Sequence, residues 1–469
     1  MDIKRLQKIN DYIWEIPKTA KKGMRVPARI FGSAKLIEEM DEGVWEQVTA
    51  TATLPGLVGA ALAMPDAHWG YGAPIGAVFA TDPECGGVIS PGAVGFDINC
   101  GMRLLTTNLK GDEVKPKIQG LVDLLFEKIP TGVGGKGVLR LNDREFKELM
   151  VEGATWIIKK GFGWEEDLES IEEGGKIEGA NPEKVSKRAL ERGRAQLGTL
   201  GSGNHYLEVQ IIEEIFDPEQ AQRWDLTEGQ VAVMIHCGSR GFGHQIATDY
   251  LKIFEDAMPR YKILVPDPQL AAVPASEEEG QDYFAAMACA ANNAFANRQF
   301  ITHQVREAFE EIFEKSAKDL GMGLIYDVAH NIAKLEKHSV NSDQRTVVVH
   351  RKGATRSFPE QPVIIGGSME TGSYLLVGTN DALKLSFGST AHGSGRTMSR
   401  AKAKRMVRGE KIQKKMKEHG IYVKSASTVG LAEEAGAAYK NISEVVEAVR
   451  GAGLSSPVAS FRPIGNIKG

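Results

Sequence analysis

Several features are scarce in this chain of 469 residues, and each shortage excludes a class of protein. There are four cysteines (Cys85, Cys100, Cys237 and Cys289) without paired spacing, so a disulfide framework is not expected and a reducing compartment fits better. No run of about 18 apolar residues occurs, so no transmembrane helix is expected. The first residues carry charges throughout and lack the apolar stretch of a secretory leader. These shortages predict a cytoplasmic protein with no membrane partner.

An excess of charge of either sign is also missing. The formal net charge is −4, so the overall charge gives no indication of a nucleic-acid partner, and any surface for one must be local. Residues 396–417 form one such candidate surface, with ten Lys or Arg residues and one Glu. Because a solvated helix face usually mixes both signs, this segment is a candidate for binding backbone phosphates.

The common nucleotide-binding motifs are missing or out of context. The chain has neither a GxxxxGK[ST] phosphate loop nor the Lys-x-Asp-Gly element that supplies the nucleophilic lysine of ordinary nucleotidyl-transferring ligases. Gly132 to Gly137 match GxGxxG, but the preceding LVDLLFEKIP predicts a helix where a dinucleotide fold requires a strand. Covalent activation of a nucleotide would therefore need another side chain.

Helix and strand patterns alternate along the chain without a regular βαβ rhythm, and no linker divides it. We predict an α+β fold, one large mixed domain over residues 1–469 with irregular sheets and surrounding helices. Helices are expected as short pieces in 1–45 and at 113–128, 283–318, 397–419 and 440–451. Strands are expected at 206–213, 230–236, 323–328, 345–350, 362–366 and 373–378. Residues 164–183 and 262–280 are expected to be exposed.

Glycine is abundant, with 52 residues, and much of it lies beside histidine, asparagine and serine. Five segments place metal-competent side chains next to glycine or at strand ends: GFDINCG (95–101), GNHYLE (203–208), IHCGSR (235–240), YDVAHN (326–331) and AHGSGR (391–396). A single histidine is more often a hydrogen-bonded structural residue, but four of the ten histidines share these settings. Thiolate, imidazole and carboxylate together disfavour Mg²⁺ and favour Zn²⁺, followed by Mn²⁺ or Fe²⁺.

The remaining histidines have plainer interpretations. His303, His338 and His419 are expected in charged, solvated helices. His350 lies in a basic run that could face RNA, and His68 and His244 could support the ligands.

The segment around His205 presents a geometric difficulty. If residues 204–210 formed a regular strand, His205 would point away from Asn204 and Glu208. Both faces of the strand would then have to reach one site, or the strand would have to twist there.

Longer motifs extend over nearly the whole chain: PDAHWGYGAPIG, GFDINCGMR, QLGTLGSGNHYLEVQ, MIHCGSRGFGH, YDVAHN, VIIGGSM, AHGSGRxxSR and the final RPIGNIKG. Together they resemble the RtcB family of RNA-splicing ligases. One departure is Glu370 in GGSMET, where the family pattern has glycine, which bears on the backbone geometry of that loop.

The resemblance implies a GTP-dependent RNA ligase that joins a 3′-phosphate or 2′,3′-cyclic phosphate end to a 5′-hydroxyl end, in tRNA splicing or RNA repair. It implies two Mn²⁺ ions held by Asp97, Cys100, His205, His236 and His330, with the Cys100 thiolate bridging. His392 would be the nucleophile that takes GMP from GTP and passes it to the RNA 3′-phosphate. Some relatives work with an archease-type activator.

The family's nucleotide pocket also has matching positions in this chain. They are Asn204, His205, Tyr206, Leu207, Glu208, His330, Asn331, Gly366, Gly367, Ser368, Met369, Ser373, His392, Gly393, Ser394, Gly395, Tyr439 and Lys468. Glu208 would read the guanine edge and Tyr439 would stack on the base. Arg240, Lys352, Arg396 and Arg400 are predicted to hold RNA phosphates. The alternatives are a binuclear metal-dependent phosphoesterase, which needs neither His392 nor Lys468, and an RNA-binding protein with a structural metal.

Overall fold

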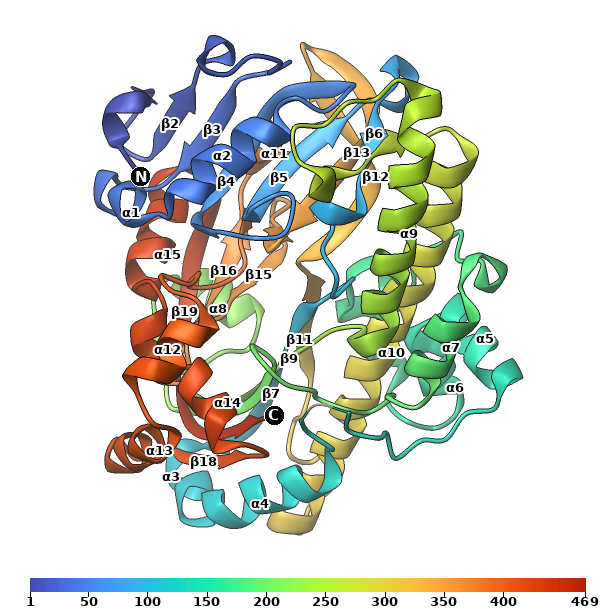
Figure 1. The fold of residues 1–469 in the computed structure, drawn as a ribbon. Helices are drawn as coiled ribbons and strands as arrows, with labels where there is room; N and C mark the ends of the chain where they lie inside the picture. Colours follow the sequence, from blue (N-terminus) through green and yellow to red (C-terminus); the bar gives the residue numbers. More distant parts are fainter. Residues whose placement is uncertain (133) are drawn as a thin grey trace.

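Two large β-sheets form the framework of the protein, and helices pack around them (Figure 1). The structure is a computed structural model that describes residues 1–132 and 134–469. In spatial order, the first sheet contains β1 (Gln7–Lys8), β2 (Ile13–Ile16), β3 (Ala28–Phe31), β4 (Leu57–His68), β5 (Ile75–Thr81), β13 (Asp343–Lys352) and β12 (Asn331–Val340). The second contains β11 (Leu324–Ala329), β7 (Gly101–Lys110), β9 (Gln230–Cys237), β8 (Tyr206–Ile215), β19 (Ser455–Lys468), β16 (Ser373–Gly378) and β15 (Pro362–Ile365), with β18 (Tyr422–Ser425) pairing with β19.

Two small sheets complete the β structure, pairing β6 (Val88–Ile89) with β10 (Val273–Pro274) and β14 (Ala354–Arg356) with β17 (Ser389–Ala391). This mixture of sheets and helices confirms the predicted α+β class. That residues 1–469 form one domain stays a prediction.

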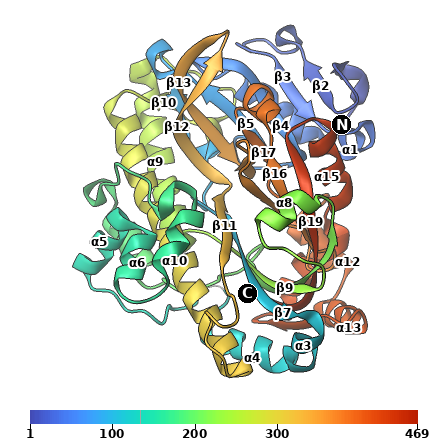
Figure 2. The ribbon, with the colours of Figure 1, turned by 180° about the vertical axis from the view of Figure 1, so that it is seen from behind.

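Two long helices, α9 (Arg240–Tyr261) and α10 (Glu278–Phe313), run side by side along one flank of the molecule (Figures 1 and 2). Residues 286–302 of α10 are buried on every side, in agreement with the apolar and small residues of this part of the helix. It ends at Glu314, which adopts a left-handed conformation, rather than at the predicted residue 318. No helix in the described part of the chain is both long enough and apolar enough to cross a membrane.

The shorter helices cover the sheets and their edges. They are α1 (Ala34–Glu39), α2 (Glu42–Thr51), α3 (Gly111–Val114), α4 (Ile118–Lys128), α5 (Asp143–Glu152), α6 (Ala154–Lys159), α7 (Lys187–Arg194), α8 (Pro218–Arg223), α11 (Asn380–Ser386), α12 (Arg400–Met406), α13 (Gly409–Glu418), α14 (Thr428–Glu433) and α15 (Ile442–Gly451). As predicted, a helix, α4, precedes the GxGxxG segment, whose residue 133 lies outside the described residues.

Most predicted elements are confirmed, and the exceptions have physical causes. The six predicted strands correspond to β8, β9, β11, β13, β15 and β16, and residues 440–451 to α15. Residues 1–45 contain three strands besides short helices, because apolar runs such as Ile13–Ile16 extend the first sheet. The predicted basic helix 397–419 is divided into α12 and α13. Gly409 opens the second piece where a Cβ atom would lie 2.0 Å from the Thr428 carbonyl oxygen.

The two segments predicted to be exposed are partly buried. Asp167 and Glu172 are 3% and 1% exposed, because each has a cationic partner from a distant element. Arg306 donates two bonds of 2.7 Å to Asp167, and Lys334 lies 2.7 Å from Glu172. Residues 262–280 include β10 in the core. The acidic composition of 164–183 therefore gave a wrong prediction.

The second sheet brings the candidate ligands to one edge. Its adjacent strands β11, β7, β9 and β8 are antiparallel, so the start of one lies beside the end of the next. Cys100 and His205 immediately precede β7 and β8, whereas His236 lies near the end of β9 and His330 follows β11. The register pairs His236 with Met102 and with Tyr206, which places all four ligands together.

Candidate active site

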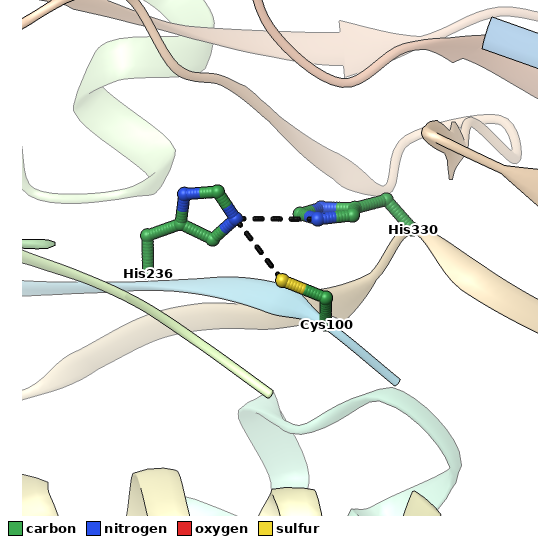
Figure 3. Close-up of side chains that lie close together, drawn as sticks. All are labelled: Cys100, His236 and His330. Atoms are coloured by element: carbon green, nitrogen blue, oxygen red, sulfur yellow. Dashed lines mark hydrogen bonds between the residues drawn. The ribbon is translucent and has the colours of Figure 1, made fainter. Parts of the chain in front are cut away.

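Five side chains predicted as metal ligands converge. The Cys100 Sγ atom lies 3.3 Å from His236 Nε2, which lies 3.2 Å from His330 Nε2 (Figure 3). The same sulfur atom lies 3.3 Å from His205 Nε2. Asp97 Oδ2 lies 2.8 Å from His205 Nε2. The ligand atoms form two groups, Asp97–Cys100–His205 and Cys100–His236–His330, each within 4.8 Å. The two groups share one sulfur atom.

The chemistry of this donor set fits a pair of metal ions. Burial lowers the pKa of His236 and His330 well below its usual value, so both rings are neutral. Nδ1 of His205 lies 3.1 Å from the Leu200 carbonyl, and with its proton on Nδ1 the ring would turn the Nε2 lone pair towards Cys100. Burial raises the pKa of the Cys100 thiol, and a bound cation would favour its thiolate. One sulfur with three imidazoles and a carboxylate suits two transition-metal ions rather than Mg²⁺.

One buried arginine connects the segments that carry these ligands. Arg298, on α10, is 0% exposed and donates to the carbonyl oxygens of Asn99 (2.8 Å) and Cys237 (2.9 Å). It also bonds both carboxylate oxygens of Asp327, at 2.7 and 2.8 Å. These three partners are sequence neighbours of Cys100, His236 and His330, so Arg298 fixes the ligand positions relative to one another.

We expect Arg298→Lys to weaken binding of Mn²⁺ about 10- to 100-fold, because one ammonium cannot bridge three segments as a planar guanidinium does. Titration with Mn²⁺ followed by electron paramagnetic resonance measures this without turnover. Arg306→Lys is the matched control, since Arg306 is a buried arginine of the same helix that bonds Asp167 and the Met322 carbonyl. Equal Mn²⁺ affinity in Arg298→Lys and the wild type would contradict this role.

His392 lies beside the metal ligands and is held by a buried carboxylate. It follows β17, and its ring centroid is 4.7 Å from that of His330. Its Nδ1 atom lies 2.6 Å from Asp66 Oδ2, which also accepts from the backbone N–H groups of His392 and Gly393. Burial disfavours the charged form of Asp66, yet the neighbouring His392 keeps the pKa of this carboxyl below its usual value. An ionised Asp66 accepts a hydrogen bond from the Nδ1–H group of His392. The proton therefore stays on Nδ1, and the Nε2 lone pair of His392 is free.

The sequence interpretation missed Asp66. It lies in PDAHWGYG, a motif quoted for the resemblance, but no chemical role was assigned to it. His68 in the same motif bonds the Asp66 carbonyl through Nδ1 at 3.0 Å, and His244 stacks on Phe96 beside Asp97 at 4.8 Å. Both lie beside the site, as predicted.

A cavity of about 650 Å³ opens in front of His392. It is lined by most of the residues predicted for a nucleotide, namely Asn204, Tyr206, His330, Asn331, Gly366, Gly367, Ser368, Met369, His392, Gly393, Ser394, Gly395, Tyr439 and Lys468. The loop at Gly366 runs alongside the His392 segment: its N–H donates to the His392 carbonyl at 3.1 Å and its carbonyl accepts from Ser394 at 2.9 Å.

Three residues predicted for the nucleotide pocket, Leu207, Glu208 and Ser373, do not line the cavity but lie behind its lining residues. Glu208 is buried and accepts hydrogen bonds from Gln210 and Asn466, and burial raises its pKa to about 7. Gln210 also donates to Ser373 at 3.3 Å, so Ser373 belongs to the same network. Leu207 points the other way, into the hydrophobic core, because alternate residues of β8 face opposite sides. Since β8 begins at Tyr206, His205 lies outside the regular strand, which resolves the predicted geometric difficulty.

A buried carboxylate, Glu434, organises the cationic side of the cavity. It is 2% exposed and lies 3.3 Å from both Arg396 Nη1 and Arg400 Nε. The Lys468 ammonium is 3.8 Å away, and the Tyr439 hydroxyl bonds the same carboxylate. Arg396 and Arg400 line the cavity, and their contact with RNA stays a prediction. Glu434 was not recognised in the sequence.

The other two predicted RNA contacts are less exposed than expected. Arg240 opens α9 with Nη1 3.0 Å from His205 Nδ1, beside a metal ligand. Lys352 is 5% exposed, and its ammonium donates to the carbonyls of Tyr71, Ala73 and Gly92. Because all three N–H groups of the ammonium already donate to carbonyl oxygens, we leave Lys352 out of the proposed RNA surface.

Two histidine predictions are wrong for a related reason. His350, in a basic run that could have faced RNA, is 0% exposed and stacks on Phe79 at 4.3 Å. His338 lies buried in β12, 3.0 Å from Glu336, rather than in a solvated helix. Burial alternates along the end of β12, which buries His338 between exposed neighbours, whereas in β13 the consecutive residues 347–352 are all buried, His350 included.

Glu370, the departure from the family pattern, is accommodated without strain. It does not adopt a positive φ, so its backbone does not require glycine. Its carboxylate accepts from the Gly436 N–H at 2.8 Å and from the Lys415 ammonium. Glu370 thereby joins the loop at Gly366 to α13.

This chain is similar to known proteins over nearly its whole length. Residues 47–469 match the family model described as tRNA-splicing ligase RtcB. A tRNA-splicing ligase RtcB of Archaeoglobus fulgidus is 53% identical, with 99% of each chain covered. Those of Thermococcus kodakarensis and Pyrobaculum aerophilum are 51% and 50% identical, covering 100% and 99% of this chain and 99% of each relative. With matches that span its whole length and include the site, this chain belongs to the tRNA-splicing ligase RtcB family.

Proposed function

We propose that this chain is a GTP- and Mn²⁺-dependent RNA ligase that joins a 3′-phosphate or 2′,3′-cyclic phosphate end to a 5′-hydroxyl end, in tRNA splicing or RNA repair. Family membership supports the reaction class. The observation that carries the mechanism is the position of His392, which is bonded to Asp66 through Nδ1 and has its ring centroid 4.7 Å from that of His330. A phosphoesterase would need the ligands but no nucleophile in this place.

In the first step, the Nε2 lone pair of His392 attacks the α-phosphorus of GTP. The P–N bond forms while the bond to pyrophosphate breaks, and pyrophosphate leaves with the electron pair. Asp66 keeps the Nδ1 proton in place and stabilises the positive charge that develops on the ring. Two Mn²⁺ ions, bound by Asp97, Cys100, His205, His236 and His330, would neutralise charge on the phosphates.

In the later steps, an oxygen of the RNA 3′-phosphate attacks the guanylate, and the P–N bond to His392 breaks. This leaves an RNA end activated by GMP. The 5′-hydroxyl of the other RNA then attacks the activated 3′-phosphate, losing its proton as GMP departs. The lining residues Lys468, Arg396 and Arg400 would hold the phosphates during these transfers.

Because of Glu208, we expect the preference of the protein for guanosine nucleotides to depend on pH. Its carboxyl has a pKa of about 7 because it is buried, so it is neutral below pH 7 and ionised above. Glu208 lies behind the cavity wall and is bonded to Gln210 and Asn466, so we propose that these side chains turn aside when the base binds. The ionised form then offers only acceptors, which match the two N–H groups of guanine, and the neutral form loses part of this match. We expect the preference for a guanosine over an inosine nucleotide to rise about tenfold between pH 6 and pH 8. Calorimetry at both pH values measures it; the ratio should be flat in Glu208→Gln, and a flat ratio in the wild type would refute this assignment.

The basic helices α12 and α13 supply the proposed RNA surface. Lys402, Arg405 and Lys411 are exposed and form no ion pair with any residue the structure describes. Replacing all three by Gln should weaken RNA binding and reduce the slope of log affinity against log salt by about 0.7 for each RNA phosphate that the variant no longer neutralises. Filter binding over a salt series measures the slope. The same change at Lys4, Lys18 and Lys22, exposed near the N-terminus, should leave it unchanged. An unaltered slope in the first variant excludes this surface.

A labelled nucleotide distinguishes the candidate functions. After incubation with Mn²⁺ and α-labelled GTP, a ligase should carry acid-labile, alkali-stable label that is absent in His392→Ala, and should join oligonucleotides with 3′-phosphate and 5′-hydroxyl ends. A phosphoesterase would hydrolyse phosphate esters without becoming labelled, and a binding protein would do neither. Repeating the assay with an archease-type protein tests the predicted activator.

A further inference from the structure

Trp69 is the single exposed tryptophan in the part of the chain that the structure describes. Its side chain is 59% exposed, whereas Trp14, Trp45 and Trp156 are 8% or less. It follows β4 three residues after Asp66, and it lines the same cavity as His392. An exposed indole at the rim of a site is a candidate binding surface, since its ring is otherwise left in water.

The indole is held in place from below. At Gly43, the second residue of α2, a Cβ atom would lie 1.7 Å from Trp69 Cε3, so the ring rests on bare backbone. The buried Gln47 accepts from the Gly70 N–H at 3.0 Å and donates to the Gly70 carbonyl at 2.5 Å. These contacts fix the backbone next to Trp69. Because the Trp69 side chain is already held in place, it loses little conformational entropy when a ligand stacks on its ring.

The charges around the cavity rim differ between its two ends. Asp41 and Trp69 both lie beside Gly43, and Glu39 ends α1 two residues earlier, so both carboxylates are on the Trp69 side of the cavity. Helices α1 and α2 are in the upper part of Figure 1. Arg396 and Arg400 lie on the other side and lead into the basic helices α12 and α13, in the lower part of Figure 1. Phosphates are disfavoured beside the two carboxylates and favoured beside the arginines. A single strand in this cavity would turn its backbone towards α12 and its bases towards Trp69.

We propose that Trp69 is a stacking platform for one unpaired base of the RNA near the ends to be joined. The proposal rests on the proposed function, since it takes RNA as the ligand. Stacking on an indole tolerates any base, so Trp69 adds affinity without sequence preference. It also orients the strand so that the terminal phosphate reaches the His392 side of the cavity.

The test is a cycle of two changes, one in the protein and one in the RNA. Binding of single-stranded oligonucleotides is measured for the wild type, Trp69→Ala and Trp69→Phe, with folding checked by circular dichroism. One series ends in a 3′-phosphate and the other begins with a 5′-hydroxyl, and each of the last few nucleotides is made abasic in turn. We expect Trp69→Ala to bind intact RNA about 5- to 150-fold more weakly, and Trp69→Phe to retain most of the affinity.

At one nucleotide position, the weakening caused by Trp69→Ala should disappear when that base is already missing, which shows that the ring and the base act on each other. The series in which this occurs identifies which RNA end is stacked. Equal binding by Trp69→Ala and the wild type would overturn the proposal, and so would a weakening of the same size on every abasic RNA. If Trp69→Ala does not fold, Trp69→Phe and Trp69→Leu are compared in the same cycle, and equal binding by the two overturns it. Failure of the wild type to bind RNA at all would instead refute the proposed function.

Discussion

Replacing Asp66 by Asn should slow guanylylation of His392 by a factor on the order of 10³ to 10⁴, the scale seen when the carboxylate that orients a catalytic histidine is removed. Asp66 Oδ2 accepts from Nδ1 of His392 at 2.6 Å and from two backbone N–H groups. An amide in this place can turn its NH₂ group towards Nδ1, which moves the ring proton to Nε2. The nitrogen that must attack phosphorus then has no free lone pair.

The rate of label incorporation from α-labelled GTP measures this effect in a single turnover. Mn²⁺ affinity should change little, because among the residues that the structure describes Asp66 bonds to no candidate metal ligand. Asp82→Asn is the matched control: Asp82 is a buried aspartate after the neighbouring strand β5 and bonds Arg345 at 3.0 Å. An Asp66→Asn enzyme within a few-fold of the wild-type rate would show that the carboxylate does not set the His392 tautomer.

Cys100→Ser should weaken Mn²⁺ binding by at least about 100-fold, with a parallel loss of guanylylation. Cys100 Sγ is the one ligand atom common to both groups of ligands, so its removal affects both ions. A serine hydroxyl is smaller and harder, and it does not ionise as a thiol does beside a cation. Because Cys100 is 2% exposed and nearly isosteric with serine, the fold should be retained.

Metal analysis after dialysis, together with Mn²⁺ titration, measures this change. Cys289→Ser serves as the control, since Cys289 is a buried cysteine in the middle of α10. Its Mn²⁺ content should equal that of the wild type. Full metal content in Cys100→Ser would remove the shared sulfur from the site.

The ligand residues could be predicted from the sequence because each lies in a recognisable local pattern, at the end of a strand or next to glycine. His236 ends an apolar strand and Cys100 lies between glycines, and both settings are readable without a partner. That the five ligands meet depends on the antiparallel order of β11, β7, β9 and β8, which no local pattern contains. The resemblance to a family supplied that step.

The supporting residues could not be found in the same way, because their partners are remote in sequence. Asp66 and His392 are separated by 326 positions, and Arg298 and Asn99 by 199. A single charged residue in an apolar run has no pattern that reveals its partner. The same limit explains the errors at Asp167 and His350, which were expected at the surface but are buried by distant elements.

The most direct test of the account is to locate the guanylate on the protein. After the wild type reacts with GTP and Mn²⁺ without RNA, intact mass and peptide mapping at neutral to alkaline pH should find one GMP on the peptide containing His392, and adding RNA with a 3′-phosphate should discharge it. A guanylate on a lysine such as Lys468, or RNA joining without any adduct at His392, would contradict the account.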